Sequence, residues 1–234
     1  MLALNLEGLS RGPASEIGAI FDWDGVIVDS SSFHEKSWER LAAETGFALP
    51  PDHFKRGFGM KNTFIIPKIL KWAEAPEKVH RLSLRKEELY RQLVVEHGIK
   101  PLPGVGPWLD ELKGSGIPCA IGSSTERLNI DTILNVLGIG EYFSAIVSAE
   151  DVSHGKPDPE VFLTAAQRIE RDPIHCVVFE DALVGIEAAH RGGMKVVAVA
   201  TTNPIEAIAG ADLAVHRLDE LSVDKLKALF QPGG

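Results

Sequence analysis

Residues 17–25 read Ile-Gly-Ala-Ile-Phe-Asp-Trp-Asp-Gly, and this stretch decides the fold. The apolar run at residues 17–21 predicts a buried strand, and two acids, Asp22 and Asp24, follow it at once. Ligands of an open α/β sheet bind beyond the carboxyl ends of its strands. The segment therefore predicts both a strand of such a sheet and a site for chemistry at its end.

Outward from this strand, short β-branched runs alternate with helical patterns, which is typical of a parallel sheet covered by helices. Further strands are predicted at residues 119–122, 145–148, 176–179 and 196–199. The helices expected beside them span residues 105–113, 125–137, 159–171 and 183–191. Asp158 before Pro159 indicates a helix N-cap, while Gly138 and Gly192 follow helix ends. The sequence thus predicts an α/β fold with a doubly wound parallel sheet.

The alternation is interrupted at residues 34–100, where only helical patterns are found. Two apolar stripes mark these helices: Trp38, Leu41, Ala42 and Thr45, closed by Gly46, and then Val79, Leu82, Leu89, Leu93 and Val94. A helical block of this length after the first strand predicts an inserted α-helical domain. We therefore expect a loose extension at residues 1–15, an α/β core at residues 16–33 plus 101–234, and a helical domain at residues 34–100.

The overall charge narrows the class of partner. Thirty-three acidic against 24 basic residues give a net charge of −9, which would repel nucleic acid and anionic membranes. No apolar stretch approaches the ~20 residues that cross a bilayer, and the first ten residues contain no basic segment, so a cytoplasmic location is expected. Cys119 and Cys176 lie in apolar runs without a C-x-x-C pattern, which predicts core residues rather than a disulfide or a zinc site.

Further polar residues follow the other predicted strands. Ser123 and Ser124 come after the second strand, Lys156 stands in Gly-Lys-Pro after the third, and the fourth closes with Glu180 and Asp181. Taken singly, each has an ordinary explanation as a turn residue, a solvated cation or an acid at a helix start. Together they predict carboxylates, a hydroxyl and an ammonium group at one edge of one sheet. A calcium loop is excluded, because the glycine of an EF-hand is sixth, not fourth.

These groups are what phosphoryl transfer to a carboxylate requires. A carboxylate that attacks a phosphate dianion is repelled unless a divalent cation bridges the two, and Mg²⁺ prefers one or two carboxylates such as Asp22 and Asp181. Lys156 would neutralise the nucleophile, and Ser123 would donate a hydrogen bond to a phosphoryl oxygen. Asp24 would then protonate the leaving oxygen and later activate water.

The motifs resemble those of the haloacid dehalogenase superfamily of phosphohydrolases, over residues 17 to about 228. They are Phe-Asp-Trp-Asp-Gly at 21–25, Gly-Ser-Ser at 122–124, Gly-Lys-Pro-Asp-Pro at 155–159, and Glu-Asp at 180–181. The resemblance implies that Asp22 is the nucleophile, Asp24 the acid/base whose main-chain carbonyl also contacts Mg²⁺, and Ser123 and Lys156 phosphoryl binders. Glu180 and Asp181 are implied to be the acids on the metal side, and Ser124 a substrate contact.

The helical insert resembles the cap of the subgroup with β-phosphoglucomutase and many small sugar-phosphate phosphatases, which implies a phosphorylated small metabolite as substrate. His34 and Lys86 fall at or near positions of a hinge histidine and a cap lysine of that mutase. Met60 stands where the mutase has an arginine for a second phosphate, although Lys61 or Arg56 could replace it. We therefore expect a phosphatase, with the mutase as the alternative and Lys61, Lys86 and His34 as candidate substrate contacts.

Two other activities of the superfamily fit less well. Dehalogenases lack the second aspartate, and phosphonoacetaldehyde hydrolases carry alanine at the position of Asp24. A catalytically inactive binding module on the same fold stays open, because a fold does not determine function. The sequence does not determine the oligomeric state or which phosphate ester is the substrate.

Overall fold

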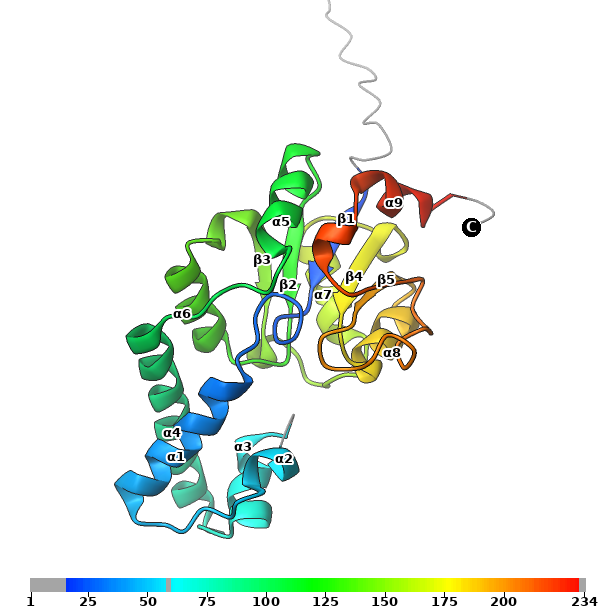
Figure 1. The fold of residues 1–234 in the computed structure, drawn as a ribbon. Helices are drawn as coiled ribbons and strands as arrows, with labels where there is room; N and C mark the ends of the chain where they lie inside the picture. The colour runs from blue at the N-terminus through cyan, green and yellow to red at the C-terminus, as the bar shows by residue number, and fades with distance from the viewer. Residues whose placement is uncertain (1–15, 58–59, 232–234) are drawn as a thin grey trace, which may run out of the picture. The chain divides into compact units, whose positions relative to one another are not determined.

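A computed structural model describes residues 16–57 and 60–231 (Figure 1). The predicted loose extension at residues 1–15 lies outside them, as do Phe58 and Gly59 of the loop that contains Met60. The chain divides into two compact units. The first contains the chain up to Val28, Pro101–Arg127 and the chain from Ile139 on, and the second contains Asp29–Lys100 and Leu128–Gly138.

The first unit is built on a six-stranded sheet in the order β3-β2-β1-β4-β5-β6, in which every neighbouring pair is parallel (Figure 1). The strands are β1 (Gly18–Phe21), β2 (Cys119–Gly122), β3 (Phe143–Val147), β4 (Cys176–Glu180), β5 (Lys195–Val199) and β6 (Leu213–Val215). Its helices are α5 (Val105–Gly114), α7 (Glu160–Arg168), α8 (Leu183–Arg191) and α9 (Val223–Ala228), and α6 (Arg127–Leu137) begins in it. The sheet order is that of a doubly wound α/β fold, as the sequence predicts.

Both faces of the central strands are buried. Ile20, on one face of β1, belongs to a cluster with Phe162 of α7 and Ile186 of α8. On the opposite face Phe21 stacks on Phe179 of β4 with ring centroids 4.4 Å apart, and Trp108 of α5 meets Phe179 edge-on at 5.9 Å. Because successive side chains of a strand point to opposite faces, a continuous apolar run is what such a central strand needs.

The order of the strands determines where the site lies. β1 pairs with β2 on one side and with β4 on the other, so the chain leaves β1 for one half of the sheet and returns to the other half at β4. Loops on the two sides of such a switch point diverge and leave room for a ligand at the carboxyl edge. Asp22 and Asp181 follow the two strands that meet there.

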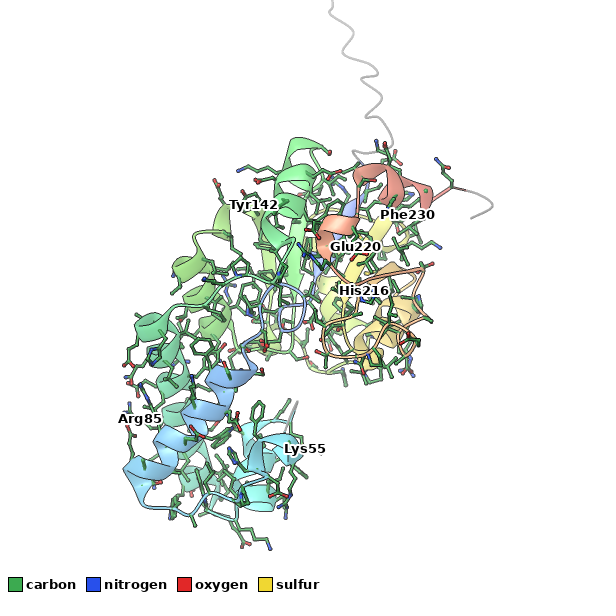
Figure 2. All side chains as sticks on the ribbon, in the orientation of Figure 1. Lys55, Arg85, Tyr142, His216, Glu220 and Phe230 are labelled. Carbon is green, nitrogen blue, oxygen red and sulfur yellow. The ribbon has the colours of Figure 1, made fainter. Side chains whose placement is uncertain are left out.

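The second unit is helical throughout its described residues. Its elements are α1 (Ser31–Thr45), α2 (His53–Gly57), α3 (Asn62–Phe64), a π-helical turn at Ile65–Leu70, α4 (Pro76–His97) and most of α6. The two predicted apolar stripes are buried apart from Thr45, which is exposed, and α1 ends at Gly46 in the left-handed conformation with φ 72°. On its surface Arg85 of α4, labelled in Figure 2, donates two hydrogen bonds of 2.7 and 2.9 Å to Glu44 of α1.

Several predicted boundaries were wrong, each for a local reason. Helix α7 begins at Glu160 with Pro159 as its N-cap, so Asp158 is not the cap, although its carboxylate accepts the Glu160 N–H at 3.0 Å. The helix ends at Arg168 because Glu170 takes a left-handed φ of 55°. Strand β6 was not predicted.

Helix α6 starts at Arg127, two residues later than predicted. The Arg127 N–H, one of the free donors at the start of the helix, donates to the Glu150 carboxylate at 3.0 Å. Thr125, which was expected in this helix, belongs instead to the site described below. The predicted helical domain at 34–100 also differs from the second unit, which begins at Asp29 and includes Leu128–Gly138 of α6. No helix among residues 16–57 and 60–231 is long and apolar enough to cross a membrane.

Candidate functional site

The polar residues predicted from the motifs gather at the carboxyl edge of the sheet in the first unit. Asp22 directly follows β1, Ser123 follows β2, and Asp181 follows β4, whose last residue is Glu180. The main chain holds them in register, because the Asp22 N–H donates to the Phe179 carbonyl at 2.9 Å. The strand ends therefore bring together groups that are about 160 residues apart in sequence.

Lys156 joins two of the carboxylates. Its Nζ lies 2.9 Å from Asp22 Oδ1 and 2.7 Å from Glu180 Oε1, and its side chain is 8% exposed. Burial opposes the ammonium charge, but the attraction of Asp22 and Glu180 outweighs it, so the pKa of Lys156 lies above its ordinary value. Lys156 is thus a fixed cation against the predicted nucleophile.

Glu180 is completely buried and is held on both oxygens. Oε1 accepts from Lys156, while Oε2 accepts the N–H groups of Asp181 at 2.7 Å and Ala182 at 2.6 Å. Its carboxylate lies against Gly185 in the first turn of α8, where a Cβ atom would stand 1.6 Å from Oε1. Burial raises the pKa of Glu180 and Lys156 lowers it, and the net effect is a pKa above the ordinary carboxyl range.

Asp181, which is 4% exposed, completes a group of three acids. One carboxylate oxygen from each of Asp22, Glu180 and Asp181 lies within 4.8 Å of the others. Burial raises the pKa of Asp181, and repulsion from Asp22 adds to it, against the hydrogen bond from Thr202. At Gly25 a Cβ atom would lie 1.9 Å from Asp181 Oδ2, so only glycine fits beside this carboxylate.

These residues fit a divalent cation of the hard, oxygen-preferring kind. Three carboxylates face one ammonium group, that of Lys156, so the cluster carries excess negative charge in a largely buried place. Burial, together with repulsion from Asp22, raises the pKa of Asp181, so its negative charge is disfavoured unless a cation lies beside it. A bound Mg²⁺ would supply the missing positive charge, and carboxylate oxygens are its usual protein ligands.

Asp24 is held by a residue outside the predicted motifs, Thr125. The Thr125 hydroxyl donates to Asp24 Oδ2 at 2.7 Å. The Thr125 N–H donates to Ser123 Oγ at 3.1 Å, and Ser123 itself is 2% exposed. Ser123 Oγ is the acceptor of that bond, whereas Ser124 beside it is exposed.

The predicted substrate contacts of the helical unit differ in their surroundings. Lys86 is 2% exposed; its Nζ lies 2.8 Å from Glu87 Oε1 and 2.5 Å from His34 Nδ1. Burial and then Lys86 lower the pKa of His34 to about 3, so its imidazole is neutral at pH 7. Lys61 is exposed at the start of α3.

Glu87 is the centre of a buried polar network in the same unit. Besides Lys86 it accepts from Asn62 Nδ2 and from Asn129 Nδ2, each at 2.7 Å. Burial opposes its charge, but the attraction of Lys86 and the hydrogen bonds outweigh that, and its pKa is lowered to about 2. The network connects α1, α3, α4 and α6, so Lys86 has a structural role whether or not it contacts substrate.

Sequence reasoning also missed the segment after β5. Thr202 donates to Asp181 Oδ2, and Asn203 Nδ2 donates to the Asp181 carbonyl at 2.9 Å. A Thr-Thr-Asn run has no distinctive pattern, and its only signal is its place directly after a predicted strand. That position, shared with Asp22, Ser123 and Asp181, could have identified it.

Comparison with known proteins identifies the family and several relatives of this chain. The sequence profile of the family described as haloacid dehalogenase-like hydrolase matches residues 19–199. The 5-amino-6-(5-phospho-D-ribitylamino)uracil phosphatase of Arabidopsis thaliana chloroplasts is 42% identical over 217 residues, 91% of this chain, which spans only 57% of that relative. The fructose-1-phosphate phosphatase YqaB of Escherichia coli is 35% identical over 78% of this chain and 95% of its own.

Among solved structures, the β-phosphoglucomutase of Clostridium difficile has a similar fold. It superposes with a TM-score of 0.76 at 28% identity and covers 91% of this chain and 96% of its own. The similarity therefore extends over the α/β unit and the helical unit alike. The named relatives include both phosphatases and a mutase, so family membership alone does not separate the two reactions.

Proposed function

The chain belongs to the haloacid dehalogenase-like hydrolase family, and on that premise we propose that it is a Mg²⁺-dependent phosphatase of small phosphate monoesters. The observation that carries the proposal is the contact of a fixed ammonium group, Lys156, with Asp22 at 2.9 Å beside two further acids. A turn with a purely structural role would not require a buried lysine among three carboxylates. A site for transferring a phosphoryl group to a carboxylate requires this arrangement.

Asp22 is the proposed nucleophile. One of its carboxylate oxygens attacks phosphorus, the ester oxygen leaves, and an acyl phosphate forms on Asp22. Lys156 is held 2.9 Å from Asp22 Oδ1 and orients that carboxylate. Ser123, buried beside the strand end, donates its hydroxyl hydrogen to a phosphoryl oxygen and so fixes the group being transferred.

Asp24 is the proposed general acid and base. In the first step its carboxyl group donates a proton to the leaving alkoxide, and in the second it takes a proton from the water that attacks the acyl phosphate. The products are the alcohol and inorganic phosphate, and Asp22 and Asp24 return to their starting states. The hydroxyl of Thr125, 2.7 Å from Asp24 Oδ2, holds this carboxylate in one orientation.

Asp22 and Asp181 are the residues that would hold Mg²⁺, with the Asp24 carbonyl as the third protein ligand that the family resemblance implies. When bound, Mg²⁺ would supply positive charge that lowers the repulsion between the nucleophile and the phosphate. Glu180 would act through Lys156 and the main chain, because both of its oxygens are already engaged there. It is a positioning residue in this scheme, a narrower role than the metal contact implied by the motif.

Sugar or sugar-alcohol phosphates are the proposed substrate class. Two of the relatives are named phosphatases of a phosphoribityl compound and of fructose 1-phosphate. The mutase is the second candidate, favoured by the fold shared with a β-phosphoglucomutase and by His34 and Lys86. Met60 is 47% exposed and apolar where the mutase pattern has arginine, which argues for hydrolysis.

The test is a phosphate-release screen with Mg²⁺ and with a chelator, over fructose 1-phosphate, 5-amino-6-(5-phospho-D-ribitylamino)uracil and other sugar phosphates. β-Glucose 1-phosphate is followed in parallel for glucose 6-phosphate. We expect Mg²⁺-dependent phosphate release. Isomer formation without free phosphate would establish the mutase, and no turnover of any ester would establish an inactive module.

A variant pair tests the nucleophile. Asp22→Asn removes the attacking carboxylate and should abolish turnover and acid-stable labelling of the protein by ³²P-labelled substrate, with the fold intact. Asp224→Asn is the matched control, because the Asp224 side chain is 94% exposed on α9. Turnover by the Asp22 variant near that of the control would overturn the mechanism.

A further inference from the structure

The segment Thr201 to Asn203, which follows β5, contacts the loop after β1 and the loop after β4, which both lie at the carboxylate cluster. Thr202 Oγ1 donates to Asp181 Oδ2, and Asn203 Nδ2 donates to the Asp181 main-chain carbonyl at 2.9 Å. On the other side Thr201 Oγ1 donates to the Gly25 carbonyl at 2.5 Å. One short stretch of chain thus connects the loop after β1 with the loop after β4.

We propose that Thr202 is a positioning residue for the divalent cation: its hydroxyl holds the Asp181 carboxylate in the orientation that binds the metal. This inference rests on the proposed function, and it extends it to a residue outside the motifs. Asn203 and Thr201 fix the two main-chain segments between which that carboxylate lies.

The crowding at Asp181 explains why one hydroxyl matters. Gly25 approaches so closely that even a Cβ atom would overlap Asp181 Oδ2, so the carboxylate has few places to go. Asp22 repels it from the cluster side. A hydrogen bond to an ionised carboxylate is among the stronger ones in proteins, and here it selects one arrangement of a side chain that like charge would otherwise displace.

Partners of metal-binding side chains commonly set the affinity of the ion, and their loss lowers it by about 10- to 100-fold. A merely structural role predicts something else. If Thr202 only stabilised the loop after β5, its replacement would lower the melting temperature and leave the affinity for Mg²⁺ unchanged.

The experiment measures Mg²⁺ binding to the full chain by isothermal titration calorimetry in the absence of substrate. Thr202→Ala and Thr202→Ser differ by the hydroxyl alone, and Thr202 is exposed apart from this bond, so both variants should fold. We expect binding about tenfold weaker in Thr202→Ala and within twofold of wild type in Thr202→Ser. The apparent KM for Mg²⁺ in turnover should rise by the same factor, while kcat at saturating Mg²⁺ changes little.

Two controls make the outcomes distinct. Thr132→Ala removes a hydroxyl that bonds only within its own helix, to the Leu128 carbonyl at 2.7 Å, and should bind Mg²⁺ like wild type. Asp181→Asn should bind Mg²⁺ far more weakly. Wild-type affinity in Thr202→Ala together with lost affinity in Asp181→Asn would overturn the positioning role alone. Wild-type affinity in Asp181→Asn would overturn the proposed metal site, and this inference with it.

Discussion

Gly185 offers the sharpest test of how Glu180 is held. Replacement by alanine would put a methyl group 1.6 Å from Glu180 Oε1 and 2.0 Å from its Cδ, far inside contact distance. Glu180 is completely buried, so its carboxylate cannot swing into solvent. It must shift within the core and give up part of its bonding to Lys156 at 2.7 Å.

The size of the effect follows from two contributions. Overpacking a buried position costs about 1–3 kcal/mol, and weakening a hydrogen bond to a buried charged group costs about 1.5–3 kcal/mol. Against these losses, the higher helix propensity of alanine relative to glycine adds about 1 kcal/mol to the unfolding free energy. We therefore expect Gly185→Ala to lose about 1.5–5 kcal/mol of unfolding free energy, or about 3–20 °C in melting temperature.

Thermal unfolding and phosphate release should be measured on the same protein. The control is Gly114→Ala at the exposed end of α5, where a Cβ atom meets nothing within 4 Å and the same gain in propensity applies. Its melting temperature should equal or exceed that of wild type. For Gly185→Ala, kcat should fall because Lys156 loses one of its two anchors. A melting temperature within 2 °C of wild type, with full activity, would refute this account of Glu180.

Two further predictions concern other parts of the chain. Thr125→Val removes the hydroxyl that holds Asp24, so kcat should fall about tenfold with little change in KM, and Thr125→Ser should restore it; equal kcat in both variants would show that Asp24 needs no such support. Glu87→Gln tests the buried pair with Lys86. The pKa of Glu87 falls from 4.5 to about 2 on folding, so its stabilisation, about 3 kcal/mol, is complete above pH 4.5 and lost as the pH falls toward 2. Unfolding measured from pH 6 to 2.5 should show a difference from wild type that shrinks with acid, and a constant difference would contradict the pKa shift.

The sequence predicted the sheet and the cluster because both depend on short-range patterns. Strand β2 and helix α8 were predicted with their observed bounds, since apolar runs and glycine ends mark them locally. The acids at 22 and 181 could be grouped because parallel strands place their carboxyl ends at one edge. Because these strands are buried, their pairing register is strongly constrained, and this register brings the two acids together.

Other features depend on contacts that no local pattern records. Strand β6 has only three residues, of which Val215 alone is β-branched, so its β-branched signal is weak. Thr125 and Thr202 each donate one hydroxyl hydrogen bond, and the acceptors, Asp24 and Asp181, are distant from them in sequence. Glu87 resembles any helix-surface acid until its burial and its two amide partners are known. Such roles could not be predicted without the tertiary structure.

The two ends of the helical insertion are held together by the main chain. Val28 forms an antiparallel bridge with Pro101, and the Leu102 N–H donates to the Ile27 carbonyl at 2.8 Å. This pairing has a kinetic consequence. Phe21 pairs with Ile121 in the sheet, so joining β1 to β2 closes a loop of about 100 residues.

If the insertion folds first, the effective loop shrinks to about a quarter of that length, which lowers the closure cost by about 1.2 kcal/mol, or roughly eightfold in rate. Helical proteins generally fold faster than parallel sheets, so we expect the helical unit to fold first. We therefore expect the central sheet to assemble after the insertion has formed, so a destabilised helix α4 would slow the folding of strands that belong to the other unit.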